Sequence, residues 1–312
     1  MQKKYYIFPL FLLLAVFAKA QADCNNLNFE KGTFTGWNGQ YGCNDEQFND
    51  FEIHFNNSCN DFGQSLDPLS AQLNNVRSQQ SIISSSYNGG VDPYVNILSL
   101  QSPLGGNYIA RIGDLYENNM AGQITKKILV SPDNALLTMY YAIVLEAPGH
   151  TPKSNNPYFR VRLVDPDGKS VPCIEYTQDG ANDAEGFKGY NCGVGGLGCQ
   201  SDRGPEGRLS EIVFRDWTVI SINLQDYIGQ EVELDLSAGG CALSGHLGYA
   251  YVDARCGKPE IIRSQDIVCP GNPATLTAPI GMENYEWRIG SETGPIVSTT
   301  NPFIVEEGGT YF

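Results

Sequence analysis

Apolar and polar residues alternate along several short segments in the middle of the chain, and this period of two predicts β-strands. Within Tyr158–Val164, for example, Phe159, Val161 and Leu163 alternate with arginines. The segment Leu136–Leu145 is almost entirely apolar, which is typical of a strand at the centre of a two-sheet core. The expected strands are Tyr108–Ile112, Gln123–Val130, Leu136–Leu145, Tyr158–Val164, Val213–Leu224 and Glu231–Leu236.

Turn residues between these segments indicate how the strands are joined. Residues 165–168 read Asp-Pro-Asp-Gly, in which proline presets φ and glycine takes the positive-φ position. This turn closes a hairpin to Val171–Tyr176. The stretch Gln178–Arg208 is rich in glycine and long, so we expect a loop held by a disulfide at Cys192 or Cys199.

The two ends of this region are expected to lie side by side. In Gly239–Cys256 the residues Tyr249, Tyr251 and Asp253 alternate with small apolar residues, which predicts a closing strand with one half-buried face. The segment 27–30 predicts a first strand that leads Trp37 onto the core, and we expect these two strands to be neighbours.

A boundary follows at Gly257-Lys258-Pro259, which divides the chain into a region 24–257 and a region 258–312. The second region has Cys269 entering a strand, Trp287 about one hairpin later and a Gly-Thr-Tyr strand near its end. This order is typical of an immunoglobulin-like sandwich, and an unrelated small β domain is the alternative.

The first residues and the charge of the chain restrict where it acts. Residues 1–22 begin with the basic pair Lys3 and Lys4, followed by a short apolar run and a small-residue cleavage site, so they predict a secretory signal peptide. No later apolar run is long enough for a spanning helix. The net charge of −15 repels phosphate backbones, which argues against a nucleic-acid partner. Acidic loops are compatible with Ca2+ or with a plain solvated surface.

All nine cysteines lie after the signal peptide, where export favours disulfides. Eight of them form an even set of disulfide candidates in the first region: Cys24, Cys43, Cys59, Cys173, Cys192, Cys199, Cys241 and Cys256. Cys269 is left without a partner, and the chain stops within an expected strand. We therefore expect a fragment in which Cys269 is unpaired and the second domain is truncated.

The motif Asn-Phe-Glu-x-Gly-x-Phe-x-Gly-Trp at 28–37, together with Tyr-Ala-Tyr-Val-Asp at 249–253, resembles the terminal strands of jelly-roll, galactose-binding-like domains. Many carbohydrate-binding modules have this architecture. The resemblance implies a structural Ca2+ held by Glu30 and Asp253. The second region resembles the Ig-like or PKD-like repeats of large secreted bacterial surface proteins. The expected fold is thus all-β, a jelly-roll β-sandwich with long disulfide-stapled loops followed by a partial Ig-like β-sandwich.

The ion and a terminal disulfide make different demands on the two strands. Antiparallel partners keep a constant sum of residue numbers, which is 283 for Glu30 opposite Asp253 and 280 for Cys24 opposite Cys256. A glutamate can reach a diagonal neighbour, whereas a disulfide needs Cα atoms within about 7 Å. The ion is therefore preferred to the Cys24–Cys256 disulfide.

Candidate ligand-binding residues are aromatic, because a flat ring matches the apolar face of a pyranose. The loop tyrosines Tyr87, Tyr94, Tyr116 and Tyr190 are proposed for this role, and His150 lies in a loop that could contact a ligand. The three tryptophans are expected in the core. The chain has only three histidines and no Gly-x-Ser-x-Gly motif, so no catalytic residue is assigned; His246 is expected to be a hydrogen-bonded structural residue.

These features predict a non-catalytic binding or adhesion module of a secreted or cell-surface multidomain protein, for which carbohydrate or another cell-surface ligand is the partner class considered. The alternative is a secreted, glycan-directed hydrolase whose catalytic residues lie in the long loops or beyond residue 312. Acid pairs such as Asp183 and Glu185 would suit that chemistry, although loop acids usually face solvent.

Overall fold

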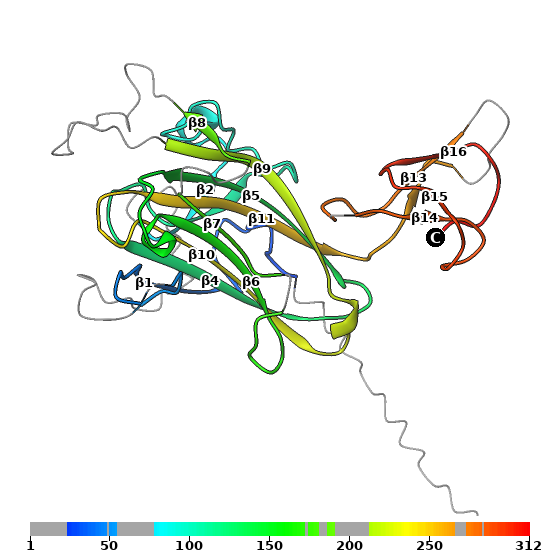
Figure 1. Cartoon of the computed structure of the whole chain (residues 1–312), viewed down its shortest axis with the longest axis horizontal. Coiled ribbons are helices and arrows are strands. Elements are labelled where there is room, and N and C mark those ends of the chain that lie inside the picture. The colour runs from blue at the N-terminus through cyan, green and yellow to red at the C-terminus, as the bar shows by residue number, and fades with distance from the viewer. Residues whose placement is uncertain are drawn as a thin grey trace, which may run out of the picture.

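The computed structural model describes residues 24–48, 50–54, 78–171, 174–180, 186–190, 212–265, 273–282 and 284–312. Two antiparallel sheets packed face to face form the larger part of the protein, and a smaller β unit follows them along the chain (Figure 1). None of the helices in these ranges is long and apolar enough to cross a membrane.

The five-stranded sheet has the order β1-β4-β10-β6-β7. Its strands are β1 (Asn38–Cys43), β4 (Met120–Leu129), β10 (Glu231–Gly239), β6 (Tyr158–Val164) and β7 (Tyr176–Asp179). The predicted hairpin after β6 is present: Val171 N donates to Leu163 O at 2.8 Å across the Asp-Pro-Asp-Gly turn.

The six-stranded sheet has the order β2-β3-β11-β5-β9-β8. Its strands are β2 (Gln80–Ser84), β3 (Tyr108–Ile112), β11 (Gly248–Gly257), β5 (Leu136–Glu146), β9 (Ile212–Asn223) and β8 (Lys188–Tyr190). Three single turns of 3-10 helix, η1 (Tyr87–Gly90), η2 (Lys153–Asn155) and η3 (Gln225–Tyr227), lie in connections. Consecutive strands from β3 to β6 and from β9 to β11 alternate between the sheets, as in a jelly roll.

The core lies between the inner faces of the two sheets. Val161 and Leu163 of β6 and Leu234 of β10 face Ile143 of β5 and Val252 of β11, and all five side chains are at most 1% exposed. The arginines that alternate with the apolar residues of β6 point out of the sandwich. The period of two in the sequence therefore identified the inner face correctly.

The first segment is not a strand, which corrects the prediction made for residues 27–30. Residues 24–36 form successive turns, in which Asn26 has φ 63° and Phe29 has φ 55°, values outside the β region. The Asn26 carboxamide donates to the carbonyls of Thr33 and Thr35 at 2.8 and 3.1 Å and so replaces sheet pairing with local bonds. The neighbours of β11 are β3 and β5.

Trp37 nevertheless lies on the core, as expected. Its ring stacks on Phe29 with centroids 5.0 Å apart and is 2% exposed. Its Nε1 donates to Asn26 O at 2.9 Å, so the turn that replaces the expected strand also holds the tryptophan.

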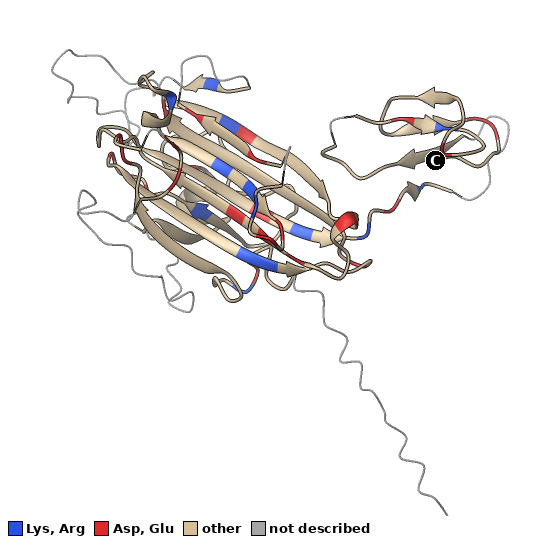
Figure 2. Cartoon of the chain, turned by 60° about the horizontal axis from the view of Figure 1, so that its bottom comes forward, with Lys and Arg blue, Asp and Glu red and all other residues tan. Residues whose placement is uncertain are grey.

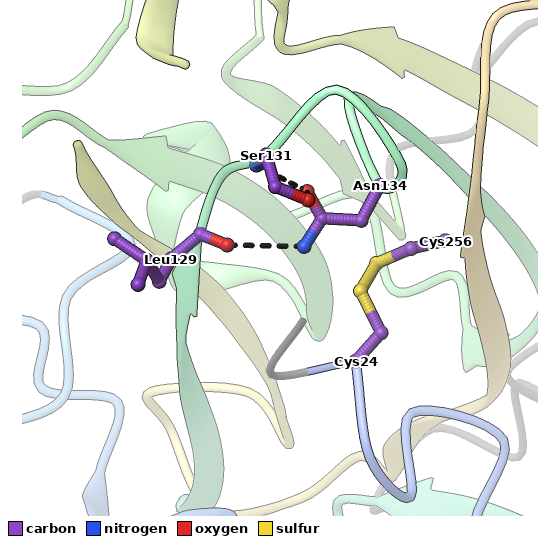
Figure 3. Close-up of a disulfide and its surroundings, with 5 residues drawn as sticks. All are labelled: Cys24, Leu129, Ser131, Asn134 and Cys256. Atoms are coloured by element: carbon purple, nitrogen blue, oxygen red, sulfur yellow. Dashed lines mark hydrogen bonds between the residues drawn. A yellow bond between two sulfur atoms is a disulfide. The ribbon is translucent and has the colours of Figure 1, made fainter. Parts of the chain in front are cut away.

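A disulfide joins Cys24 to Cys256, with Cα atoms 5.9 Å apart (Figure 3). The low rank given to this disulfide was wrong, because the residue-sum argument assumed that residues 24–30 pair with β11 in one register. The turns remove that restriction. Beside the disulfide, Asn134 closes the β4–β5 connection: its Nδ2 donates to Leu129 O at 3.0 Å (Figure 3).

The C-terminal unit consists of two small sheets. One contains β12 (Ile262–Arg263), β13 (Ala274–Thr277) and β16 (Phe303–Val305), and the other contains β14 (Trp287–Arg288) and β15 (Ile296–Ser298). Trp287 is 2% exposed and its ring lies 5.7 Å from that of Phe303. An Ig-like or PKD-like identity for this unit stays a prediction, and Cys269 lies outside the described residues.

Candidate functional site

The outer face of the six-stranded sheet carries a second apolar layer. Tyr249 and Tyr251 of β11 point to this face, opposite Ala250 and Val252, as the alternation predicted. The layer is capped by the connection between β2 and β3, from which Val95, Leu98 and Leu100 pack onto the tyrosines. Tyr249 and Tyr251 are consequently at most 1% exposed, so β11 is buried on both faces and not on one.

Asp92 fastens that connection to the sheet. Its Oδ2 accepts the hydroxyls of Tyr249 and Tyr251 at 2.8 and 2.7 Å. Its Oδ1 accepts the backbone N–H groups of Tyr94 and Val95 at 2.8 and 2.6 Å. Desolvation raises the pKa of this buried carboxyl. Four donors on one side chain make the covering loop a fixed part of the surface.

A β-bulge in β9 turns Trp217 toward the same outer face. Asp216 and Trp217 both lie opposite the single residue Ala142 of β5, where the pairing register shifts. One extra residue in a strand reverses the face of the sheet to which each following side chain points. Trp217 therefore points to the same face as Phe214. Its Nε1 donates to Ser99 O at 2.8 Å, and the side chain is half-buried.

Two tyrosines complete this group. The Tyr190 hydroxyl donates to the Asn96 side chain, and its ring meets Phe214 edge-on at 6.1 Å. Tyr87, in η1, is half-buried against the same apolar layer. We call Tyr87, Tyr190 and Trp217 the aromatic surface. Both Tyr190 and Trp217 bond to the one loop that contains Asn96, so their rings are held in place before any ligand arrives.

The structure separates the remaining candidates from this surface. Tyr94 packs against the same apolar layer, but its hydroxyl donates to Leu115 O at 2.7 Å, and burial raises the pKa of Tyr94 to about 12. Tyr116, which follows β3, is 42% exposed and is not among the side chains that pack against the layer. His150 lies beside His246. The acid pair Asp183 and Glu185 lies outside the described residues.

The outer face of the five-stranded sheet is polar instead. Charged residues occur on neighbouring strands of this sheet (Figure 2). Asp235 of β10, 3% exposed, accepts hydrogen bonds from Gln123 of β4 at 2.7 Å and from Arg162 of β6 at 3.0 and 2.5 Å. Glu52, from the segment after β1, accepts a bidentate bond from Arg160 at 2.7 and 2.8 Å. These charged side chains are therefore paired with one another.

Glu30 and Asp253 meet across the loop before β3. Both oxygens of Glu30 accept the Asn107 N–H, at 2.8 and 3.0 Å, and Oε1 also accepts that of Tyr108 at 3.0 Å. Gly106 has φ +90°, and a Cβ there would lie 2.2 Å from Glu30 Oε1, so only glycine allows this approach. Asp253 bonds the Ser102 side chain.

The electrostatics of this pair fit a bound cation. Desolvation, together with the nearby charge of Glu30, raises the pKa of Asp253 to about 7. Asp253 Oδ1 is buried and has no hydrogen-bond partner among the described residues. A buried carboxylate oxygen without a donor, next to a second carboxylate, is a suitable ligand atom for a hard cation such as Ca2+.

The cysteines are only partly as expected. Cys24 and Cys256 are bonded, and Cys43 is also disulfide-bonded. Cys241 is a free, buried thiol, which corrects its place among the disulfide candidates; its Sγ faces His246 Nδ1 at 3.2 Å. The candidates outside the described residues are Cys59, Cys173, Cys192 and Cys199.

Neither a protein-family model nor a curated relative matches the chain. Among solved structures, it is similar to a carbohydrate-binding module in complex with beta-1,4-galactotriose, at 9% identity and TM-score 0.34, covering 75% of this chain and 96% of the other. It is also similar to the K2 cleaved adhesin domain of Lys-gingipain, at 14% identity and TM-score 0.29, with coverages of 60% and 92%. A third is a Caldicellulosiruptor saccharolyticus module in complex with mannohexaose, at 9% identity and TM-score 0.26, with coverages of 59% and 98%. Overlap this weak does not identify a ligand.

Proposed function

We propose that the β-sandwich is a non-catalytic binding module of an exported protein and that it recognises carbohydrate at the aromatic surface. The observation that carries the proposal is the pair Tyr190 and Trp217, two half-buried rings fixed by hydrogen bonds to one loop. A planar ring offers a large apolar area with little side-chain freedom to lose on binding. Such rings suit the flat apolar face of a sugar.

Polar groups around the rings supply the second requirement. Asn88 and Asn96 are exposed beside Tyr87 and Tyr190, and their amides can both donate to and accept from sugar hydroxyls. The underlying layer is rigid because Asp92 fixes the loop. A pre-formed surface of rings and amides supports binding, whereas no group of this surface is arranged as a nucleophile with its base.

We also propose that Glu30 and Asp253 hold a structural Ca2+, with Asp253 Oδ1 as a ligand atom. The ion would join the turn segment 24–36 to β11, near the disulfide at Cys256. Its role is stabilisation and not chemistry, because it would tie the turn segment and β11 to the connection before β3, which both carboxylates already contact.

The experiment is a binding screen of the purified chain on soluble polysaccharides, by affinity electrophoresis and then calorimetry on the best ligand. Trp217→Ala and Tyr190→Ala should each weaken binding at least ~10-fold, as expected when a well-packed aromatic contact is truncated. Tyr116→Ala is the matched control, because Tyr116 is an exposed tyrosine outside the aromatic surface, and it should bind as the wild type does.

The same samples separate binding from hydrolysis. Release of reducing ends should stay at the background level for every polysaccharide that binds. Release that follows the protein concentration would favour the hydrolase. If Tyr116→Ala abolished binding while Trp217→Ala did not, the site would have to be moved to another part of the surface.

A further inference from the structure

Three potential metal ligands meet at the end of the sandwich, at a place the carbohydrate proposal does not use. They are His150, in the connection between β5 and β6, and Cys241 and His246, in the connection between β10 and β11. One ligand atom of each side chain lies within 4.8 Å of those of the other two. Cys241 is buried and both histidines are half-buried.

The distances match the edges of a tetrahedral coordination shell. His246 Nδ1 lies 3.2 Å from Cys241 Sγ and 3.2 Å from His150 Nε2. With Zn–N near 2.1 Å and Zn–S near 2.3 Å, a tetrahedron has edges of about 3.4 Å between two nitrogens and about 3.6 Å between nitrogen and sulfur. Both short contacts are therefore close to the spacing that one shared ion would impose.

Hydrogen bonding alone does not explain the cluster. His246 Nδ1 carries either one proton or one lone pair, so it forms one good hydrogen bond and not two. Yet both Cys241 Sγ and His150 Nε2 approach it at 3.2 Å. A cation satisfies all three at once, because a thiolate and two neutral imidazoles each direct a lone pair at it.

The two loops are locked to each other around these ligands. Asn44, fully buried after β1, donates through Nδ2 to Asn156 O at 3.3 Å on one side and to Gly240 O at 3.2 Å on the other. The Asn156 side chain accepts the His150 N–H at 2.7 Å and donates to His150 O at 3.3 Å. The backbone of His150 is thus held in position by Asn156, whether or not its ring binds a ligand.

The turn from Cys241 to His246 is wrapped around the sulfur. Cys241 N donates to His246 O at 3.0 Å and Ser244 N donates to Cys241 O at 3.0 Å. Gly245 N–H donates to Cys241 Sγ at 3.2 Å, which is a bond suited to a thiolate. Ser244 takes a positive φ of 63° so that this turn can close.

We propose that Cys241, His246 and His150 form a binding site for a borderline transition-metal ion of the Zn2+ class. Two imidazoles and one thiolate suit Zn2+ better than Ca2+ or Mg2+, which require oxygen ligands. The three side chains fill three corners of a tetrahedron, and the half-buried histidines leave the fourth corner for solvent or an external ligand.

The test uses the exported, untagged chain with its disulfides intact, stripped of metal by a chelator and dialysed. Titration with Zn2+ in a calorimeter should show one site with a micromolar or tighter Kd, and an excess of Ca2+ should not compete. Loading with Co2+ should give the charge-transfer absorption of a cobalt–thiolate bond, which reports the sulfur directly.

Cys241→Ser and His150→Gln should each weaken Zn2+ binding by more than ~100-fold, and Asn156→Ala, which only places His150, by about 10-fold. His54→Gln is the matched control, because the His54 ring bonds Asp50 and is not one of the three clustered ligands, and it should bind Zn2+ as the wild type does. Circular dichroism checks the fold of each variant. The proposal is wrong if the wild type binds no Zn2+. It is also wrong if Cys241→Ser binds Zn2+ as tightly as the wild type and keeps the cobalt–thiolate absorption band.

Discussion

The two outer faces of the sandwich begin from the same alternating strands and are completed in different ways. On the five-stranded sheet, Gln123 and Arg162, on the two strands that flank β10, both donate hydrogen bonds to Asp235. On the six-stranded sheet, Tyr249 and Tyr251 are covered by a loop that Asp92 holds down. One face is closed by charge pairing and the other by a second apolar layer, which ends in the half-buried aromatic surface.

This difference explains why ligand binding is assigned to one face. On the five-stranded sheet, the charged groups of Asp235, Arg162 and Glu52 are already bonded to one another, so a sugar there would have to replace good charge-assisted bonds. On the six-stranded sheet, Trp217 and Tyr190 keep part of their rings free while their polar atoms are fixed. Binding there costs little desolvation of charge and little ordering of side chains.

The largest expected effect tests the charge pairing. Asp235→Ala should lower the free energy of unfolding by about 3 kcal/mol, because it leaves the Gln123 amide without its acceptor and Arg162 with Glu52 as its remaining charge partner. Urea unfolding followed by tryptophan fluorescence measures the change. If the loss were small, the network would not be what stabilises this face.

The matched control for that variant is Glu231→Ala, on the same strand and the same face. Glu231 pairs with Lys127 at 2.9 Å, but both side chains are more than half exposed. An exposed pair contributes less than about 1 kcal/mol, so this variant should unfold close to the wild type. The two results together compare the contribution of a buried charged pair to stability with that of an exposed pair on the same strand.

The next effect concerns Asp253, which lies on the same face of β11 as Tyr249 and Tyr251. No described residue donates a hydrogen bond to its Oδ1. If Glu30 and Asp253 hold Ca2+, a hundredfold excess over Kd should stabilise the fold by about 2.7 kcal/mol. Melting curves with Ca2+ and with chelator measure it. Asp253→Asn should remove the difference and Asp216→Asn, an exposed control in β9, should keep it; equal curves for the wild type would exclude a stabilising ion.

Strands that depend on side-chain alternation alone were predictable from the sequence. Tyr108–Ile112 and Tyr158–Val164 have the bounds that the sequence indicated, and the alternation of β11, with Tyr249 and Tyr251 on one face and Ala250 and Val252 on the other, was predicted correctly. The strand predicted for residues 27–30 is absent because Asn26 and Phe29 take positive φ values, which the alternating pattern does not reveal. Local side-chain bonding outweighed strand propensity there.

The candidate sites were harder to predict because they depend on register and on distant contacts. Tyr87 and Tyr190 were proposed from their loops, but Trp217 was placed in the core, since a bulge that turns a residue over leaves no mark in the alternation. The cluster of His150, Cys241 and His246 joins residues more than ninety positions apart. No local motif signals such a meeting, and only the pairing of the two loops creates it.

The smallest effect tests the polar face by its response to acid. The hydrogen bond from Arg160 holds the pKa of Glu52 below its usual value of 4.5. A folded-state pKa below the unfolded value means that this carboxylate stabilises the fold above pH 4.5 and that the contribution is lost as the pH falls through the folded pKa. Because Glu52 is 43% exposed, solvent weakens the effect.

Urea unfolding between neutral pH and pH ~3 should therefore show that the free energy of unfolding falls modestly more steeply with acid for the wild type than for Glu52→Gln. Glu231→Gln, in the exposed pair, should follow the wild type. Identical pH profiles for wild type and Glu52→Gln would mean that Arg160 and Glu52 do not stabilise the polar face, and that its stability comes from Asp235 alone.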